Sequence, residues 1–514
     1  METHFDVLVI GAGSAGSVLA ARLTADPACR VCLVEAGDEP ADPDIADPLK
    51  WTQLQGRAYD WAYRTVPQPF TDWRVHEWPR GKVVGGSGCL HAMAYVRGHA
   101  DDFDAWRTAG GERWSFESLL PAFRRSESFT AFEHSARGLG GPLDVWLPQD
   151  EVSPVVRAYI AAGQALGAPV LSDHNSGSIV GTSPNSLNIR NGRRLSVADA
   201  YLTPEVRSRP NLTILTGCEV DEIEWENSLA AGIVAVRGSE TLRLSADRIV
   251  LSAGAISSPL ILMRSGIGPE ASLRDAGIAC RLDRTEIGEN LQDHLLGLGN
   301  VYRARKPVPP SRLQHSESLM YLHGDDMARA EGSPDIVLAC VVAPSAAAGL
   351  KAPPYGSAYT LLFGVTHPQS RGQLRPGGPS RKDAPIIDPR YLDAEYDRAT
   401  FRTALRRARE VGAHPALDEW RDAEVLPGPE ARTDQELDAF VARSVSTHHH
   451  PCGTCRMGTD DDAVVDADLR VRGFDNLFVV DASIIPAIPC GPINAAVVAL
   501  AEHWVAEVAG APTR

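Results

Sequence analysis

The sequence lacks any uninterrupted apolar run near the ~20 residues that a membrane-spanning helix requires, so we expect no membrane insertion. It also lacks a basic N-terminal segment followed by an apolar stretch, so we expect no secretory leader. The nine cysteines are an odd number scattered from Cys29 to Cys490, unlike the dense pairs of a small disulfide-bonded domain. These absences favour a reduced, cytoplasmic protein.

Positive charge is also in short supply. The 514 residues include 50 Lys and Arg against 66 Asp and Glu, which gives a formal net charge of −16. Such a chain repels nucleic acid and anionic membranes, so neither is an expected partner. Hydrophobic residues make up 44% and charged residues 23%, as in ordinary globular proteins, and we find no internal repeat or low-complexity segment. The length predicts about two or three domains.

The N-terminal residues have the pattern of a dinucleotide-binding βαβ unit. An apolar, β-branched run, Phe5–Ile10, leads into the glycine-rich turn Gly11–Gly16, and apolar residues at helical spacing follow in Ser17–Leu23. A second apolar run, Arg30–Val34, ends at the acidic residue Glu35. Strand, glycine turn, helix, strand and terminal acid in this order are typical of the phosphate clamp of a Rossmann-like fold.

Each part of this clamp has a predicted role. Gly11 permits the tight turn, Gly13 lets the backbone approach a pyrophosphate, and Gly16 allows the helix to pack close to the strand. Free N–H groups at the helix N-terminus would face the phosphates, and Glu35 would accept hydrogen bonds from a ribose diol. The predicted binding set is completed by Ser14, Ala15 and Ala36. FAD and NAD both fit such a clamp, so this segment alone leaves the cofactor open.

A second glycine-rich segment, Trp78–Met93, favours a large flat ligand. Its glycines remove side-chain bulk, which suits backbone laid against a ring system. The interleaved Val83, Val84 and Leu90 indicate that the segment is buried and is not an ordinary surface loop.

This segment resembles the first signature motif of the glucose–methanol–choline (GMC) oxidoreductases, which are FAD enzymes. Further stretches are similar to the same family, in family order, and the similarity runs from residue 5 to about residue 505. They are Arg194–Leu202, Gly254–Gly268, Gly288–His294 and Ser446–Gly458. Two long signature motifs in the correct order are far more specific than a glycine turn. The resemblance therefore implies FAD as the cofactor.

The resemblance also implies a mixed α/β fold with two domains: a Rossmann-like FAD-binding domain and a substrate domain built on an antiparallel sheet. The FAD-binding domain is expected to be discontinuous and to comprise residues 1–145, 193–300 and 462–514. The substrate domain would then comprise residues 146–192 and 301–461. The first of these two segments is rich in Gly, Ser, Asn and Pro, which favours loops and short strands.

The stretch His448–His450, followed by Pro451, Cys452 and Cys455, admits several interpretations. Imidazole and thiolate are zinc ligands, but consecutive side chains of an extended segment point to opposite faces, so we expect no metal site. A redox cysteine pair works at a helix N-terminus, which Pro451 and Gly453 disfavour. Histidines that only satisfy local hydrogen bonds are a third possibility. A catalytic base, with an ordinary pKa of about 6.5, is the fourth.

The resemblance favours catalysis. In the family, the histidine before that proline and an Asn or His in a later loop form the catalytic pair, which implies these roles for His450 and Asn494. His450 would take the hydroxyl proton of an alcohol, hydride would pass to flavin N5, and a carbonyl compound would leave. The expected substrate-pocket residues are His449 and Ser318. The further expected FAD contacts are Gly85, Ser87, His91, Ala92, Val220, Ala253, Asp481, Ala482, Ala495 and Asn494 itself.

Three positions depart from the family pattern. Members with covalently attached FAD have histidine where this chain has Leu90, so we expect non-covalent FAD. His91 stands where asparagine is commoner, and a contact to the flavin edge is expected there. His449 stands where relatives often have an aromatic residue, which makes the expected pocket more polar.

The predicted activity is oxidation of a small primary alcohol to an aldehyde by an FAD-dependent alcohol oxidase or dehydrogenase, with oxygen or another electron acceptor. His449 and the polar run Gln314–Ser318 point toward a heterocyclic or hydroxylated alcohol, as used by the hydroxymethylfurfural and pyridoxine oxidases of the family. The alternatives are a choline-type dehydrogenase with a non-oxygen acceptor, an NAD-dependent dehydrogenase, and a lyase or scaffold protein with structural FAD.

Overall fold

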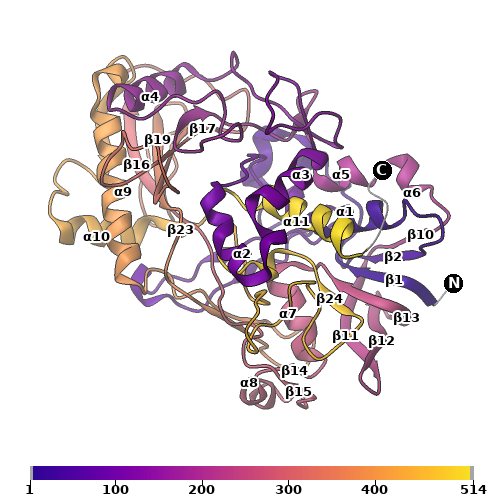
Figure 1. The fold of residues 1–514 in the computed structure, drawn as a ribbon. Helices are drawn as coiled ribbons and strands as arrows, with labels where there is room; N and C mark the ends of the chain where they lie inside the picture. The colour runs from indigo at the N-terminus through magenta and orange to yellow at the C-terminus, as the bar shows by residue number, and fades with distance from the viewer. Residues whose placement is uncertain (1–3, 510–514) are drawn as a thin grey trace.

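Two β-sheets of different character organise the protein, for which a computed structural model describes residues 4–509 (Figure 1). The first sheet has seven strands in the order β10-β2-β1-β13-β12-β11, with β24 paired to β13. Its strands come from three distant parts of the chain. They are β1 (His4–Ile10), β2 (Val31–Val34), β10 (Leu212–Leu215), β11 (Cys218–Glu226), β12 (Leu229–Arg237), β13 (Glu240–Leu251) and β24 (Leu477–Val479).

The centre of this sheet is parallel and buried. β1 pairs in parallel with β2 and β13, so that Val9 lies opposite Leu33 on one side and Val250 on the other. Uninterrupted apolar strands of this kind are typical of parallel sheets covered on both faces. The helix α1 (Ser14–Leu23) follows β1 after the glycine turn and packs against α11 (Asn494–Glu507). The sequence-based prediction of a Rossmann-like unit is confirmed.

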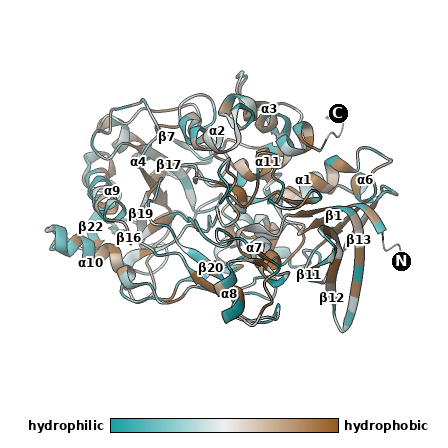
Figure 2. Cartoon of the chain, turned by 60° about the horizontal axis from the view of Figure 1, so that its bottom comes forward, coloured by the Kyte–Doolittle hydropathy of each residue, from teal (hydrophilic) through white to brown (hydrophobic). Residues whose placement is uncertain are grey.

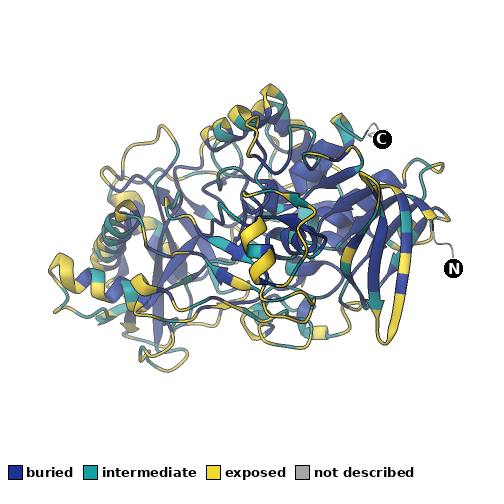
Figure 3. Cartoon of the chain, turned by 90° about the horizontal axis from the view of Figure 1, so that it is seen from below, coloured by how far each residue is buried: buried dark blue, intermediate teal, exposed yellow. Residues whose placement is uncertain are grey.

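The second sheet is antiparallel and has six strands in the order β17-β18-β19-β16-β22, with β23 paired to β16. They are β16 (Leu295–Ala304), β17 (Ser316–Leu322), β18 (Ile336–Val341), β19 (Ala358–Val365), β22 (Arg421–Leu426) and β23 (Val445–Thr447). The helix α9 (Glu395–Ala413) covers this sheet with Phe401, Leu405 and Ala408 and turns charged residues outward (Figures 2 and 3). The expected antiparallel substrate-domain sheet is confirmed.

The remaining elements connect and cover the two sheets. The other α-helices are α2 (Asp104–Gly110), α3 (Phe116–Ser126), α4 (Pro154–Ala165), α5 (Val197–Tyr201), α6 (Pro204–Arg207), α7 (Gly254–Arg264), α8 (Glu270–Asp275) and α10 (Asp434–Ser444). The short strands are β3 (Tyr63–Arg64), β4 (Glu77–Trp78), β5 (Glu127–Phe129), β6 (Leu143–Val145), β7 (Gly181–Pro184), β8 (Ile189–Arg190), β9 (Arg193–Arg194), β14 (Ile267–Gly268), β15 (Leu282–Asp283), β20 (Gln373–Arg375) and β21 (Ile386–Asp388). Within residues 4–509, no helix is both long and apolar enough to cross a membrane.

Two sequence-based expectations need correction. The segment 146–192, expected to form loops and short strands, contains the 12-residue helix α4. Pro154 suits the first turn of a helix, where its missing N–H is not needed, and Val155, Tyr159 and Ala162 then lie buried at helical spacing. The boundary drawn after residue 300 falls inside β16, so the second sheet begins earlier than expected. The other domain boundaries remain a prediction.

Candidate active site

A cavity of about 1650 Å³ is lined by residues of both sheets. Ile10 and Val34 reach it from the first sheet, and Leu296, Leu319 and Leu362 reach it from the second. Most residues predicted to bind cofactor or substrate share this lining. They are Gly11, Gly13, Ser14, Ala15, Glu35, Ala36, Ser87, His91, Ala92, Val220, Ala253, His449, His450, Asp481, Ala482 and Asn494.

Some predicted contacts support the cavity wall from behind. Gly16 does not line the cavity, because it packs against the turn: a Cβ at this position would lie 1.8 Å from the carbonyl oxygen of Gly11. Gly85 donates its N–H to the carbonyl oxygen of Ala12 at 2.8 Å and ties the second glycine-rich segment to the first. Ala495 is buried within α11. The structure therefore places Gly16, Gly85 and Ala495 behind the cavity wall.

Ser318, an expected residue of the substrate pocket, does not line the cavity. Its side chain is fully buried and donates a hydrogen bond to the carbonyl oxygen of Ser183 at 2.7 Å. Its strand neighbour Leu319 lines the cavity instead. Successive side chains of a strand point to opposite faces of the sheet, so Ser318 points away from the face on which Leu319 lies.

The glycine turn brings bare backbone to the cavity. Gly11 has φ of +101°, and a Cβ there would lie 2.7 Å from the carbonyl oxygen of Ser252, so no other residue fits this position without strain. At Gly13 a Cβ would meet only the Cα of Gly86, 4.0 Å away. The two glycine-rich segments thus meet at Gly13 and Gly86 without side chains between them. The cavity wall here consists of main chain beside the N-terminus of α1, the surface that binds phosphates well.

Glu35 ends β2 with its carboxyl group in the cavity wall. It accepts hydrogen bonds from the N–H of Ala12 at 2.8 Å and from the N–H of Gly37 at 2.9 Å. Burial raises the pKa of Glu35 to about 7, against the opposing effect of these N–H groups and of Lys82. The carboxyl group fixes the turn and still faces the cavity, as a group that binds ribose hydroxyls must.

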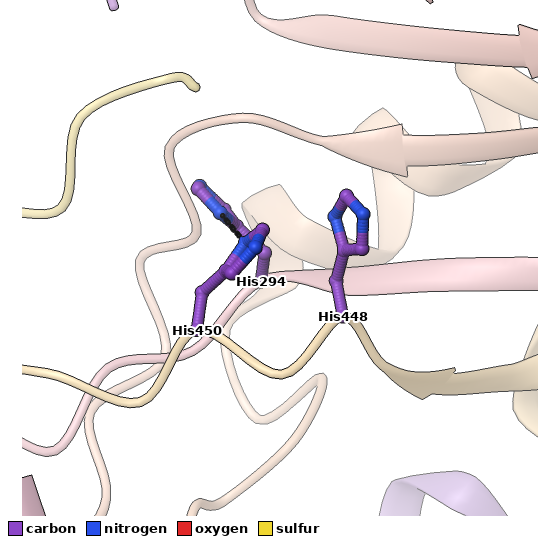
Figure 4. A group of neighbouring side chains, drawn as sticks. All are labelled: His294, His448 and His450. Carbon is purple, nitrogen blue, oxygen red and sulfur yellow. Dashed lines mark hydrogen bonds between the residues drawn. The ribbon is translucent and has the colours of Figure 1, made fainter. Parts of the chain in front are cut away.

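Three imidazoles gather from two distant segments of the chain (Figure 4). Nδ1 of His450 lies 3.0 Å from Nδ1 of His294, and the ring centroids of His450 and His448 are 4.4 Å apart. His448 and His450 line the cavity, whereas His294 is 4% exposed and lies behind them. The strand pairing of β16 with β23, which sets Leu295 opposite Thr447, brings the two segments together.

A buried carboxylate holds the backbone of the histidine segment. The N–H of His450 donates to Oδ1 of Asp293 at 2.8 Å. The hydroxyl groups of Thr447 and Tyr391 donate to the other oxygen of Asp293 at 2.6 and 2.5 Å. Burial raises the pKa of Asp293 to about 6, while the hydrogen bonds from Thr447, Tyr391 and His450 and the charge of Arg80 oppose this shift. Charge-assisted hydrogen bonds of this kind are short and strong.

His449 joins His448 to His450 in an unusual backbone conformation. Its backbone adopts the left-handed conformation with φ of +68°, a strained state that costs about 1–3 kcal/mol in a non-glycine residue. The hydroxyl group of Thr447 accepts its N–H at 2.8 Å, and Arg80 donates Nη1 to its carbonyl oxygen at 2.9 Å. These contacts offset the strain and hold the backbone between His448 and His450.

The imidazoles are held neutral. Burial lowers the pKa of His450 and of His448 well below the ordinary value, and the neighbouring histidines lower both further. Burial also lowers the pKa of His449 to about 3 and that of His294 to about 4. An imidazole that is neutral near pH 7 is able to accept a proton, which a base must do.

Asn494 begins α11 and lines the same cavity. Its Nδ2 donates to the hydroxyl oxygen of Ser14 at 2.8 Å, and its Oδ1 is buried without a partner among the described residues. Because the Ser14 hydroxyl also donates, the amide can take the reverse orientation, with Oδ1 toward Ser14 and Nδ2 toward the cavity. Both orientations leave one polar amide atom for a ligand.

Three imidazoles lie close enough together to hold a metal ion, whereas the two cysteines are too buried for redox chemistry. His294, His448 and His450 have ring nitrogens within 4.8 Å of one another. The proximity of His294 was not visible in the sequence, because it lies 154 residues before His448 (448 − 294). Cys452 and Cys455 are fully buried and unpaired, and burial raises the pKa of both thiols, so they lack the thiolate that redox chemistry requires.

The family assignment rests on matches that span most of the chain. Residues 5–296 and 368–501 match the two parts of the GMC oxidoreductase family. The chain belongs to the GMC oxidoreductase family. The sequence-based prediction of an FAD-dependent oxidoreductase that acts on CH–OH groups is confirmed.

Several known proteins are similar to this GMC oxidoreductase along nearly its whole length. It is 52% identical to the pyridoxine 4-oxidase of Microbacterium luteolum over 98% of this chain and 99% of that one. It is 35% identical to an oxygen-dependent choline dehydrogenase of Photobacterium profundum over 99% and 94% of the two chains. The crystal structure of pyridoxine 4-oxidase from Mesorbium loti is similar with a TM-score of 0.97, 54% identity, and coverage of 99% and 100%.

FAD is the cofactor typical of this family, and the residues present fit it. Main chain at Gly13 and Gly86, where no Cβ intervenes, leaves room for a pyrophosphate beside α1. Buried polar atoms in the lining also lack a partner among the described residues, as a ligand site requires: Oδ1 of Asn494, Oγ of Ser252, and Nε and Nη2 of Arg80. The cavity exceeds the roughly 300–1,000 Å³ of ordinary small-molecule sites.

Sequence reasoning missed three supporting residues of the histidine cluster: Arg80, Asp293 and His294. All three lie in stretches that carried the family resemblance, Trp78–Met93 and Gly288–His294, but no function was assigned to them. Their contacts with residues 447–450 span more than 150 positions of sequence. Only the pairing of β16 with β23 brings the latter two to the cluster.

Proposed function

We propose that this protein oxidises the primary hydroxymethyl group of a hydroxylated aromatic nitrogen heterocycle of the pyridoxine type to the aldehyde, with oxygen as electron acceptor. The observation that carries the proposal is the end-to-end similarity to the pyridoxine 4-oxidase of Microbacterium luteolum, at 52% identity. A neutral, cavity-lining His450 supplies the base that such an oxidation needs.

The residues around the cavity have separate roles in the proposed reaction. His450 takes the proton of the substrate hydroxyl, and a well-placed base of this kind contributes about 10²–10⁴-fold to the rate. Asn494 offers an amide atom in the cavity lining that stabilises the developing alkoxide or orients the cofactor. Bound FAD supplies the two-electron oxidant. The carboxyl group of Glu35 and the main chain at Gly13 hold the cofactor.

The wall near the histidines suits a flat heterocycle. Leu296, Leu319 and Leu362 offer apolar contact, while His448 and His449 place imidazoles in the same lining. Apolar walls with a few polar groups are typical of small-molecule sites. A substituted pyridine ring can pack on the leucines and form hydrogen bonds to the imidazoles. This combination favours such a substrate over a purely aliphatic alcohol.

We further propose that FAD is bound without a covalent link. Leu90, which stands where covalent members have histidine, packs in an apolar cluster with Ile45, Leu54 and Val83 and offers no nucleophile. Nδ1 of His91, next in the chain, accepts the N–H of Met93 at 2.8 Å. Precipitation with acid should release all of the flavin into the supernatant. Yellow colour that stays with the denatured protein would contradict the proposal.

A panel of alcohols tests the substrate. The purified holoenzyme is mixed anaerobically with pyridoxine, 5-hydroxymethylfurfural, benzyl alcohol or choline, and bleaching of the flavin is followed. Parallel aerobic reactions measure hydrogen peroxide and, with an artificial acceptor, dye reduction. Pyridoxine should bleach the flavin fastest and yield peroxide. Preference for choline, or dye reduction without peroxide, would favour a choline-type dehydrogenase, and no bleaching by any alcohol would favour a lyase or scaffold.

A further inference from the structure

Behind the proposed base lies a histidine that does not reach the cavity. Each ring nitrogen of His294 faces one partner: Nε2 lies 2.8 Å from the carbonyl oxygen of Thr366, and Nδ1 lies 3.0 Å from Nδ1 of His450. His294 is 4% exposed and is absent from the described cavity lining. Thr366, His294 and His450 form a chain of hydrogen bonds that leads from the end of β19 to the cavity, and Figure 4 shows its link between His294 and His450.

The carbonyl at the end of this chain determines every proton position in it. A carbonyl oxygen only accepts, so Nε2 of His294 carries a hydrogen. A neutral imidazole has one N–H, so Nδ1 of His294 is an acceptor. The facing Nδ1 of His450 must therefore donate. The lone pair of a neutral His450 then lies on Nε2, which has no hydrogen-bond partner among residues 4–509.

These proton positions hold only while His294 is neutral, because a protonated ring would donate from both nitrogens and force the opposite tautomer on His450. Burial lowers the pKa of His294 to about 4, so the ring is neutral near pH 7. The neighbouring Asp293 holds the backbone N–H of His450. Adjacent residues thus fix the backbone and the ring of the same histidine.

We propose that His294 is a positioning residue, which fixes His450 in the tautomer whose Nε2 is free to take the substrate's hydroxyl proton. The proposal rests on the proposed role of His450 in alcohol oxidation. It adds that the base works only when its Nδ1–H has an acceptor behind it. Second partners of this kind commonly decide which ring nitrogen of a histidine is protonated.

Three substitutions separate positioning from simple packing. His294→Asn keeps an acceptor oxygen near the position of Nδ1 but cannot reach Thr366. His294→Gln reaches Thr366 from the position of Nε2 but offers no acceptor where Nδ1 was. His294→Leu removes both. FAD content and melting temperature establish that each variant is folded.

The positioning role predicts an order of activities. His294→Asn should keep kcat within about tenfold of the wild type, while His294→Gln and His294→Leu should lose about 10²-fold, within the range that a general base contributes. KM should stay nearly constant, because His294 does not contact the cavity. A Gln variant as active as the Asn variant would show that the contact to Thr366 matters instead, and would overturn the proposal.

A spectroscopic measurement tests the tautomer without any substrate. In holoenzyme labelled with [¹⁵N]histidine, ring ¹⁵N shifts distinguish a protonated nitrogen from one with a lone pair, and the signals that His450→Gln removes belong to His450. The wild type should show a protonated Nδ1 on His450, and His294→Leu should shift the proton toward Nε2. An unchanged tautomer in His294→Leu would refute the proposal. This result stands even if every alcohol of the panel fails, so the two hypotheses fail separately.

Discussion

The two sheets contribute different chemical groups to the cavity lining. The first sheet contributes the main chain of the glycine turn and the carboxyl group of Glu35 from the first 36 residues, and later segments beside it add Val220, Ala253 and Asp481. The antiparallel sheet contributes the imidazoles of His448 and His450, held from behind by Asp293 and His294 of a segment more than 150 residues away. The glycine turn and Glu35 at the centre of the expected cofactor half are therefore local in sequence, whereas the catalytic half is assembled by tertiary contacts.

This difference predicts which property, FAD binding or reaction rate, a substitution in each half should change. Changes in the cofactor half should release FAD and leave the histidine cluster intact, because the two share few residues. Changes in the histidine cluster should leave FAD bound and slow the reaction.

Removal of the base should have the largest effect. His450→Gln should slow anaerobic reduction of the flavin by alcohol about 10²–10⁴-fold, because the substrate hydroxyl loses its proton acceptor. FAD should remain bound at the wild-type ratio. Stopped-flow absorbance measures the rate, and His134→Gln, on the exposed surface, is the matched control. A wild-type rate in His450→Gln would remove the catalytic role from the cluster.

Two glycine substitutions should distinguish folding from binding. In Gly16→Ala the methyl group would lie 1.8 Å from the carbonyl oxygen of Gly11, so we expect a loss of at least about 3 kcal/mol in the free energy of unfolding. In Gly13→Ala the methyl group meets no protein atom closer than 4.0 Å and extends from a cavity-lining position.

Gly13→Ala should therefore leave the unfolding of the flavin-free protein unchanged and abolish retention of FAD during purification. Thermal denaturation and the ratio of flavin to protein absorbance measure the two effects. If Gly13→Ala holds FAD as tightly as the wild type, the assignment of the turn to the pyrophosphate is wrong.

Glu35→Gln should weaken cofactor binding by about 10–100-fold, since hydrogen bonds to a charged group contribute about 1.5–3 kcal/mol. The amide keeps the shape of the side chain but offers one acceptor oxygen in place of two, while Ala12 and Gly37 already use both. Fluorescence titration of the flavin-free protein with FAD measures the change. The rate constant for flavin reduction at saturating FAD should stay constant, and a fall in that constant would couple the two halves.

The smallest effect concerns pH. The folded-state pKa of His450 lies below the ordinary 6.5, first because of burial and then because of His448, His294, His449 and Arg80. A lowered pKa keeps the base neutral to lower pH, so the acid limb of kcat/KM should fall below pH 6.5 and activity should persist through neutral pH. Initial rates across pH 4–8 measure it. An acid limb at or above 6.5 would show that the cluster does not hold His450 neutral.

Prediction from the sequence succeeded where a motif is local. Gly11, Gly13 and Glu35 lie in the cavity lining because strand, turn, helix and strand follow one another without interruption. Prediction was less successful where the position of a residue along a strand decides which face of the sheet its side chain occupies. Ser318 and Leu319 differ only in the face of β17 on which they lie, and composition gives no information about that face. The helix α4 was missed because its stabilisation comes from buried packing of Val155 and Tyr159, which propensity does not report.

Residue types and short spacings were enough to assign the family, to predict the glycine turn as a phosphate site and to single out the histidine before Pro451. Tertiary structure decided which imidazoles meet, which of them reaches the cavity, and which ring nitrogen is left with a lone pair. The pairing of β16 with β23 sets Leu295 opposite Thr447, and no local pattern encodes that register. The proton position on His450 then follows from a carbonyl oxygen 84 residues before it (450 − 366).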